Sequence, residues 1–129
     1  MRNEYYDLSK GFSDVSPMST FEVSVYYNNG FLVLNGFCIY TTGSYMPRNT
    51  EIPVATMSFK IGEERIVRLR RSVNRYQSPL SVGIGDDAYI TTTFLYDDGR
   101  VSIRTTCEKL LNTAFSIIAP CYLEPTSSI

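Results

Sequence analysis

Carboxylates are the side chains of this chain that could supply an acid and a base near neutral pH, because the sequence contains no histidine. Serine and cysteine nucleophiles that depend on a histidine base are therefore excluded. Two adjacent pairs, Asp86 with Asp87 and Asp97 with Asp98, have the residue type that glycoside hydrolysis requires. Neighbouring aspartates beside a glycine usually accept hydrogen bonds from the backbone of a turn. We therefore expect turns at both pairs, and a protein that is not an enzyme.

The three cysteines do not follow a metal-binding or disulfide pattern. Cys38, Cys107 and Cys121 are widely spaced, with no CxxC pair and no histidine to complete a zinc site. Two alternatives stay open: Cys107 and Cys121 pair across neighbouring strands, or the cysteines are small buried apolar residues. We favour the second alternative, which fits synthesis in a reducing compartment, and we expect no metal and no cofactor.

The charge balance argues against a nucleic-acid partner. Twelve basic residues face 13 acidic ones, and the sequence pI is near 5.4, whereas nucleic-acid binding rests on an excess of Lys and Arg. No apolar run approaches the roughly 20 residues of a membrane span. The first ten residues are too polar for a signal peptide. We expect neither nucleic-acid binding nor membrane insertion.

One stretch, ERIVRLRRSVNR (64–75), concentrates the arginines. On a strand, Val67 and Leu69 would face inward, while Arg68 and Arg70 would face solvent or a neighbouring chain. This pattern allows an anion site, for instance for a phosphate on a wall polymer. It also allows a solvated strand face that protects a sheet edge from unwanted pairing.

Two polar segments combine an aromatic ring, a guanidinium group and a side-chain amide. Loops on a rigid β scaffold often carry recognition, and these three groups can hold a sugar ring and its hydroxyls. The candidate ligand-binding residues are Tyr45, Arg48 and Asn49 in the loop 41–51, and Arg75, Tyr76 and Gln77 in the irregular segment 72–79. Tyrosines within predicted strands, among them Tyr96, are expected in the core or at an interface instead.

These segments need strands to position them, and the sequence predicts about eight. Asp98-Gly99 is a strong hairpin signal, because the central positions of a type I′ turn need φ > 0. Asn29-Gly30 predicts a second turn, and Asn35-Gly36 a bulge or a close approach of another backbone. The predicted strands are 21–26, 31–40, 52–61, 64–71, 80–84, 88–96, 100–106 and 114–123, with a turn at 85–87.

The strand pattern predicts an all-β fold, an antiparallel β-sandwich or jelly roll of about eight strands. In the predicted strand 21–26, Phe21, Val23 and Val25 alternate with polar residues and are expected on one buried face. The first 17 residues show no sustained periodicity. We therefore divide the chain into an N-terminal arm or linker, residues 1–17, and a head domain, residues 18–129.

The order of these elements resembles the C-terminal head domain of tailed-phage receptor-binding proteins and tail fibres. The similar motifs are a strand pair with a central Asn-Gly, a proline-containing strand, a hairpin of the form DG-x-V-x-I and a closing Tyr-Leu. In this chain they are FLVLNGFCIY (31–40), EIPVATMSF (51–59), DGRVSI (98–103) and Tyr122-Leu123, within a region that covers residues 21–123.

The resemblance implies a homotrimeric knob at a tail tip or baseplate of a virion, made in the host cytoplasm. Such a head would bind host cell-surface saccharide without catalysis and would contact other tail or baseplate proteins. Two alternatives belong to other classes. One is a structural virion protein, such as a baseplate, fibre-joining or capsid-decoration subunit, without glycan binding. The other is a cellular carbohydrate-binding or adhesin domain.

Overall fold

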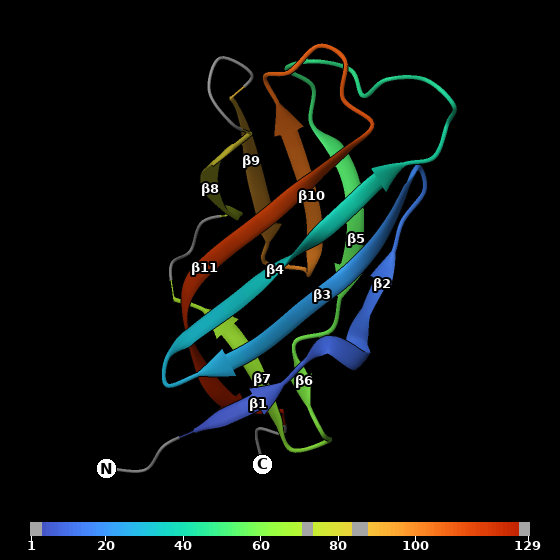
Figure 1. The fold of residues 1–129 in the computed structure, drawn as a ribbon. Coiled ribbons are helices and arrows are strands. Elements are labelled where there is room, and N and C mark those ends of the chain that lie inside the picture. Colours follow the sequence, from blue (N-terminus) through green and yellow to red (C-terminus); the bar gives the residue numbers. More distant parts are fainter. Residues whose placement is uncertain (1–3, 71–73, 84–87, 127–129) are drawn as a thin grey trace.

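A computed structural model describes residues 4–70, 74–83 and 88–126, and it places them in two antiparallel β-sheets that pack face to face (Figure 1). The six-stranded sheet contains, in spatial order, β1 (Tyr5–Asp7), β3 (Met18–Asn28), β4 (Phe31–Tyr40), β11 (Asn112–Pro125), β7 (Arg65–Leu69) and β6 (Lys60–Ile61). The five-stranded sheet contains β2 (Phe12–Asp14), β5 (Ile52–Met57), β10 (Arg100–Thr105), β9 (Tyr89–Tyr96) and β8 (Arg75–Val82).

The described residues include no α-helix, only a short 3₁₀ turn, η1 (Ser9–Gly11). The prediction of an all-β sandwich is therefore confirmed. In Figure 1 the long strands β3, β4 and β11 form one layer, and β5, β9 and β10 cross behind them.

The core lies between the sheets because successive side chains of a strand point to opposite faces. In β4, Leu32, Leu34 and Cys38 point inward and are fully buried. The inward residues of β11 include Phe115 and Ile117, and β5, β9 and β10 supply the opposite wall. In β7 the same alternation buries Val67 and leaves Arg68 exposed, as predicted.

Buried threonines join the two sheets by hydrogen bonds. The hydroxyl groups of Thr91 in β9 and Thr113 in β11 lie 2.9 Å apart, and Thr93 Oγ1 accepts from the Ser116 N–H at 3.1 Å. An unpaired hydroxyl at these sites would cost about 1–3 kcal/mol. No buried side-chain nitrogen or oxygen in the described part of the chain lacks a partner, so this polar layer is compatible with the apolar core.

A bulge in β3 changes which residues face the core. Phe21 pairs with Phe37, but Ser24 pairs with Asn35, so β3 has one residue more than β4 in this interval. Glu22 takes a φ of 53° there. The extra residue turns Phe21 outward while Val25 stays buried, so the expectation that both share one face is wrong.

Gly36 permits the close approach at this bulge. A Cβ at position 36 would lie 3.2 Å from Val23 Cα and 3.0 Å from the Phe115 ring. The sequence correctly predicts a bulge or close approach at Asn35-Gly36, and the structure places the extra residue on the facing strand.

Three further segments differ from the predicted pattern. The predicted strand 52–61 divides into β5 and β6, which belong to different sheets. The predicted irregular segment 72–79 is part of β8 from Arg75 onward. Within the predicted arm, β1 pairs with β3 and β2 pairs with β5. The sequence does not reveal these two strands, because three residues are too few to show a periodicity.

All three cysteines are free, so the alternative of a Cys107–Cys121 disulfide is wrong. Cys38 and Cys121 are buried, and burial raises the pKa of each thiol to about 12. Cys107 is partly exposed, so the prediction of a buried apolar role is confirmed for two of the three residues.

The hairpin between β9 and β10 is confirmed, with a different turn. Asp97-Asp98-Gly99 form a three-residue connection in which Gly99 has a φ of 93° and its N–H donates to Tyr96 O at 3.0 Å. Asp98 Oδ1 accepts from the Arg100 N–H at 3.1 Å, which is the expected role of a turn aspartate. The predicted turn at 85–87, with Asp86 and Asp87, lies outside the described residues.

Gly99 also allows the hairpin to dock on β5, and this predicts a stability difference between two glycines. A Cβ at position 99 would lie 2.2 Å from Met57 O, whereas Gly43 has a similar φ of 86° and nothing within 4 Å. We expect Gly43→Ala to lower the free energy of unfolding by about 1 kcal/mol, through the left-handed backbone alone. Gly99→Ala should cost at least ~1–2 kcal/mol more, because the hairpin must move away from β5. Urea unfolding measures both; equal losses would contradict the close approach.

Candidate functional site

A shallow hollow of about 260 Å³ lies on the outer face of the five-stranded sheet. It extends over β5 and β10 and the end of β9, and mixes polar groups with an apolar floor. Its lining residues are Val15, Glu51, Pro53, Ala55, Thr56, Tyr96, Arg100, Val101 and Ser102. Such a combination of convergent polar groups on a concave surface is typical of small-ligand sites.

The Glu51 carboxylate is the centre of the polar groups. Its Oε1 accepts from Arg75 Nη1 at 2.7 Å, and its Oε2 accepts from Ser102 Oγ at 2.7 Å and from the Tyr96 hydroxyl. Arg75 Nη1 also donates to the Tyr96 oxygen at 3.3 Å. The carboxylate is therefore held in one orientation by groups from three strands.

The electrostatics of this cluster favour the charged carboxylate. Partial burial by itself would raise the pKa of Glu51, but the hydrogen bonds from Tyr96 and Ser102 and the charge of Arg75 outweigh it, and the pKa is lowered. Glu51 therefore remains ionised near neutral pH and acts as a hydrogen-bond acceptor.

Guanidinium groups stack on two aromatic rings of β9. Arg100 Cζ lies 4.2 Å from the centre of the Tyr96 ring, and Arg75 Cζ lies 4.4 Å from that of Phe94. Arg104 Cζ lies over the same Phe94 ring at 5.2 Å. Phe94 is fully buried although it belongs to the outer face, because these arginines cover it.

Strand register brings these residues together. Ser102 pairs with Phe94 on one side and with Pro53 on the other, and all three point outward while Val101 and Ile103 face the core. A register shift in β10 between Val101 and Ser102 places Ser102 beside the start of β5, next to Glu51. The site therefore depends on the pairing of the β9–β10 hairpin with β5, which is distant from it in sequence.

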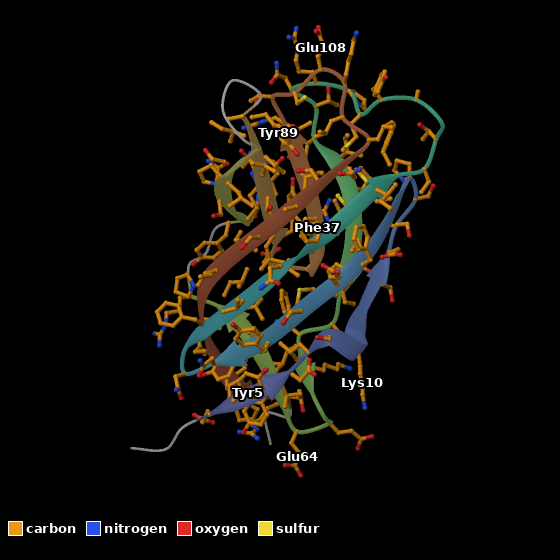
Figure 2. The ribbon with its side chains drawn as sticks, viewed as in Figure 1. Tyr5, Lys10, Phe37, Glu64, Tyr89 and Glu108 are labelled. Carbon is orange, nitrogen blue, oxygen red and sulfur yellow. The ribbon has the colours of Figure 1, made fainter. Side chains whose placement is uncertain are left out.

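The structure separates the residues that the sequence predicts to bind. Tyr45 lies in the loop 41–51 with half of its surface exposed, and Arg48 Nη1 is 3.5 Å from Glu108 Oε1. The Asn49 N–H donates to Thr105 O at 2.8 Å. This loop lies at the end of the molecule that Glu108 marks in Figure 2.

The second predicted set lies on β8 and not in a loop. Arg75 and Gln77 are exposed, and Arg75 joins the site through Glu51. Tyr76 is half-buried and packs against the core, because it alternates with Arg75 along the strand. Arg75 therefore contributes to the hollow, whereas the Tyr76 ring is directed toward the core.

Sequence reasoning missed Glu51, Tyr96, Arg100 and Ser102. The sequence pattern places Glu51 at the end of a loop and Tyr96 in the core or at an interface. The available signal is the alternation of side chains in β9 and β10. Because Leu95 and Val101 point inward, their neighbours Tyr96 and Ser102 must point outward. The register that joins them to Glu51 has no local signature.

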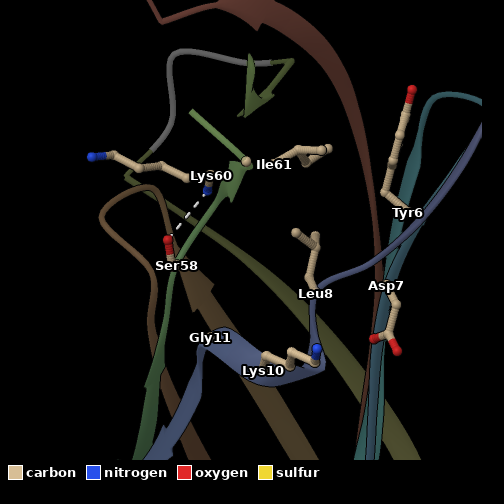
Figure 3. Close-up of a pocket in the computed structure, with 9 residues that line it drawn as sticks. Tyr6, Asp7, Leu8, Lys10, Gly11, Ser58, Lys60 and Ile61 are labelled. Atoms are coloured by element: carbon tan, nitrogen blue, oxygen red, sulfur yellow. Dashed lines mark hydrogen bonds between the residues drawn. The ribbon is translucent and has the colours of Figure 1, made fainter. Parts of the chain in front are cut away.

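A larger cavity of about 360 Å³ lies where β1 and η1 meet β6 (Figure 3). Its polar groups do not converge. The Asp7 carboxylate accepts from the Ser9 N–H at 2.8 Å, and Ser58 Oγ accepts from the Lys60 N–H at 3.2 Å. In Figure 3 the Lys60 side chain extends away from Leu8 and Ile61. We therefore assign the candidate site to the hollow on the five-stranded sheet.

The described residues contain no group of three or more cysteine, aspartate or glutamate side chains placed to hold a metal ion. None of the helical segments among them has the length and apolarity needed to cross a membrane. Comparisons of the chain with protein-family models, with curated proteins and with solved structures find no match.

The Glu51 cluster predicts a pH-dependent contribution to stability. Because the pKa of Glu51 in the folded protein is below its ordinary value of 4.5, its stabilisation is complete above that pH and disappears as pH falls through the folded pKa. We expect Glu51→Gln to lower the free energy of unfolding by about 1–2 kcal/mol at neutral pH. The loss should shrink as acid protonates the wild-type carboxylate.

Urea unfolding at neutral and acidic pH measures this difference. Glu108→Gln is the control, because its ion pair with Arg48 is exposed and should contribute little at either pH. A loss in Glu51→Gln that stays constant over this pH range would contradict the role assigned to the carboxylate.

Proposed function

We propose that this chain is a non-catalytic binding head that attaches a virion tail or baseplate to saccharide on the host cell surface. The observation that carries the proposal is the hollow around Glu51, where a fixed carboxylate, two hydroxyl groups and stacked guanidinium groups meet above an apolar floor. The order of sequence motifs that resembles phage receptor-binding heads supplies the virion context.

The chemistry of the hollow suits a sugar. A sugar hydroxyl both donates and accepts hydrogen bonds, and the hollow offers a carboxylate acceptor and the hydroxyl groups of Tyr96 and Ser102. Pro53 and the stacked Arg100–Tyr96 pair give flat surfaces for the apolar face of a ring. Glu51 has no second carboxylate among the lining residues, so the arrangement supports binding and not glycoside hydrolysis.

The surrounding charge favours a saccharide with an acidic substituent. Arg75 and Arg100 have carboxylate partners, Glu51 and Asp98, but Arg104 lies on the Phe94 ring with no carboxylate of the described residues within 4.0 Å. Guanidinium groups bind carboxylate and phosphate through paired N–H donors. A phosphate or uronate group near the hollow would find such donors on Arg100 and Arg104.

We further propose that the head is a homotrimer that contacts other tail or baseplate proteins and that it needs no cofactor. Several identical shallow sites on one particle strengthen attachment without any additional contact in each site. A structural virion protein with the same fold would assemble in the same way but bind no glycan. A cellular carbohydrate-binding or adhesin domain would bind as a single chain.

The loop 41–51, with Tyr45, Arg48 and Asn49, is the second candidate for the ligand site. Its exposed tyrosine and arginine keep it compatible with sugar binding. Arg100 and Arg48 form a matched pair for the test, because each is an exposed arginine next to a carboxylate, in Asp98 and Glu108 respectively.

A glycan array with neutral and acidic saccharides tests the proposal. We expect binding to acidic saccharides, and a loss of about tenfold or more in Arg100→Ala, equivalent to ~1.4 kcal/mol. Arg48→Ala should bind like the wild type if the hollow is the site; the reverse pattern would place the ligand in the loop. No binding to the array or to host cell walls would favour a structural virion protein.

A further inference from the structure

The outer face of the six-stranded sheet concentrates exposed apolar side chains. Seven of the ten large hydrophobic residues that are exposed in the described part of the chain lie on it. We call it the aromatic face and define it by Phe21, Phe31, Phe37, Ile39, Ile118 and Tyr122, with Tyr5 at its margin. A concentration of exposed apolar side chains on a folded protein usually marks an interaction site.

The strand register arranges these residues in rows. Phe21 pairs with Phe37, and their rings stack at 5.5 Å. Val33 lies opposite Ile118 on the neighbouring strand, and Tyr5 packs against Tyr26 at 5.2 Å at the margin. Phe37 lies near the middle of this layer and Tyr5 near its end (Figures 1 and 2). The polar row Ser24–Asn35–Ser116 lies between the Phe21–Phe37 pair and the Val33–Ile118 pair, so the apolar side chains form two groups on one face of the sheet.

Charge is almost absent from the centre of the aromatic face. The strands β4 and β11 contain one charged side chain between them, Glu124, and Arg68 Nε neutralises it at 2.8 Å. Two copies of this face can approach without repulsion, and the face offers no charge pattern that would select an oppositely charged partner. Depletion of charge is typical of the buried centre of subunit interfaces.

The size of the face is sufficient for a stable contact between two copies. β4 has ten residues and spans about 33 Å, and strands lie about 4.8 Å apart. The three long strands with the short β1 and β7 beside them cover roughly 600 Å² on each copy, or about 1,200 Å² in total, the lower limit for stable protein interfaces.

We propose that copies of this chain assemble by packing their aromatic faces against one another. The inference gives a location to the proposed self-assembly, and it does not depend on the ligand. In the proposed homotrimer, the three aromatic faces would meet around the three-fold axis. The faces that carry the Glu51 hollows are on the opposite side of each sandwich, so they stay exposed in the assembly.

Two isoleucines provide a matched test. Ile118 in β11 is 61% exposed on the aromatic face, and Ile90 in β9 is 44% exposed on the other sheet. By light scattering after gel filtration, we expect wild type and Ile90→Asp to be oligomers. Ile118→Asp should have the single-chain mass of 14.6 kDa with an unchanged circular dichroism spectrum, because an aspartate in the contact would be buried without a partner.

A monomeric wild type at high micromolar concentration would overturn the proposal, and so would an Ile118→Asp protein that remains an oligomer. If Ile118→Asp does not fold, Phe37→Ser tests the same face with a neutral residue. Saccharide affinity per site, measured on the monomeric variant, separates this inference from the proposed function. A monomeric Ile118→Asp protein with unchanged affinity per site supports the interface. An Ile118→Asp protein that remains an oligomer but loses affinity would argue against the hollow as the saccharide site.

Discussion

The antiparallel ladder between β4 and β11 is the interaction on which the rest of the molecule depends. Nine residue pairs, from Asn112 with Ile39 to Pro120 with Phe31, fix the register of the two longest neighbouring strands. Because side chains alternate, this register directs Leu34, Phe115 and Ile117 into the core. It also sets Thr113 opposite Thr91, so the same ladder joins the two sheets. A slip by one residue would expose the core and bury the aromatic face.

The two outer faces of the sandwich have different chemistry, and this division organises the proposed function. The five-stranded sheet presents Glu51, Tyr96, Ser102 and the stacked arginines around a hollow. The six-stranded sheet presents aromatic and aliphatic side chains, and its central strands β4 and β11 carry one charged side chain, Glu124. Polar groups held in fixed directions suit recognition of a hydrated sugar, whereas a sheet face with little charge at its centre suits another protein surface. Attachment and assembly can therefore operate without competing for one surface.

Local patterns predict the fold well where the alternation of apolar residues and the turn residues indicate the same strand boundaries. The Asn29-Gly30 and Asp98-Gly99 hairpins are confirmed, and so is the inward direction of Val67 with Arg68 outward. The failures have specific causes. The bulge at Glu22 shifts the period within β3, and the passage from β5 to β6 changes sheets without a proline or glycine at the break. β1 and β2 are too short to show a pattern, so their pairing with both sheets had no visible signal.

The sequence by itself determined the all-β class, the turns and the absence of a histidine-based catalytic site, because these follow from residue type and spacing along the chain. Only the tertiary structure decided the candidate site. Glu51 lies 45 residues before Tyr96 and 51 before Ser102, and their contact depends on the pairing of β10 with β9 and β5 and on the shift between Val101 and Ser102. Likewise, Phe21 is a core residue by pattern and a surface residue in the fold, because one extra residue in β3 turns it outward.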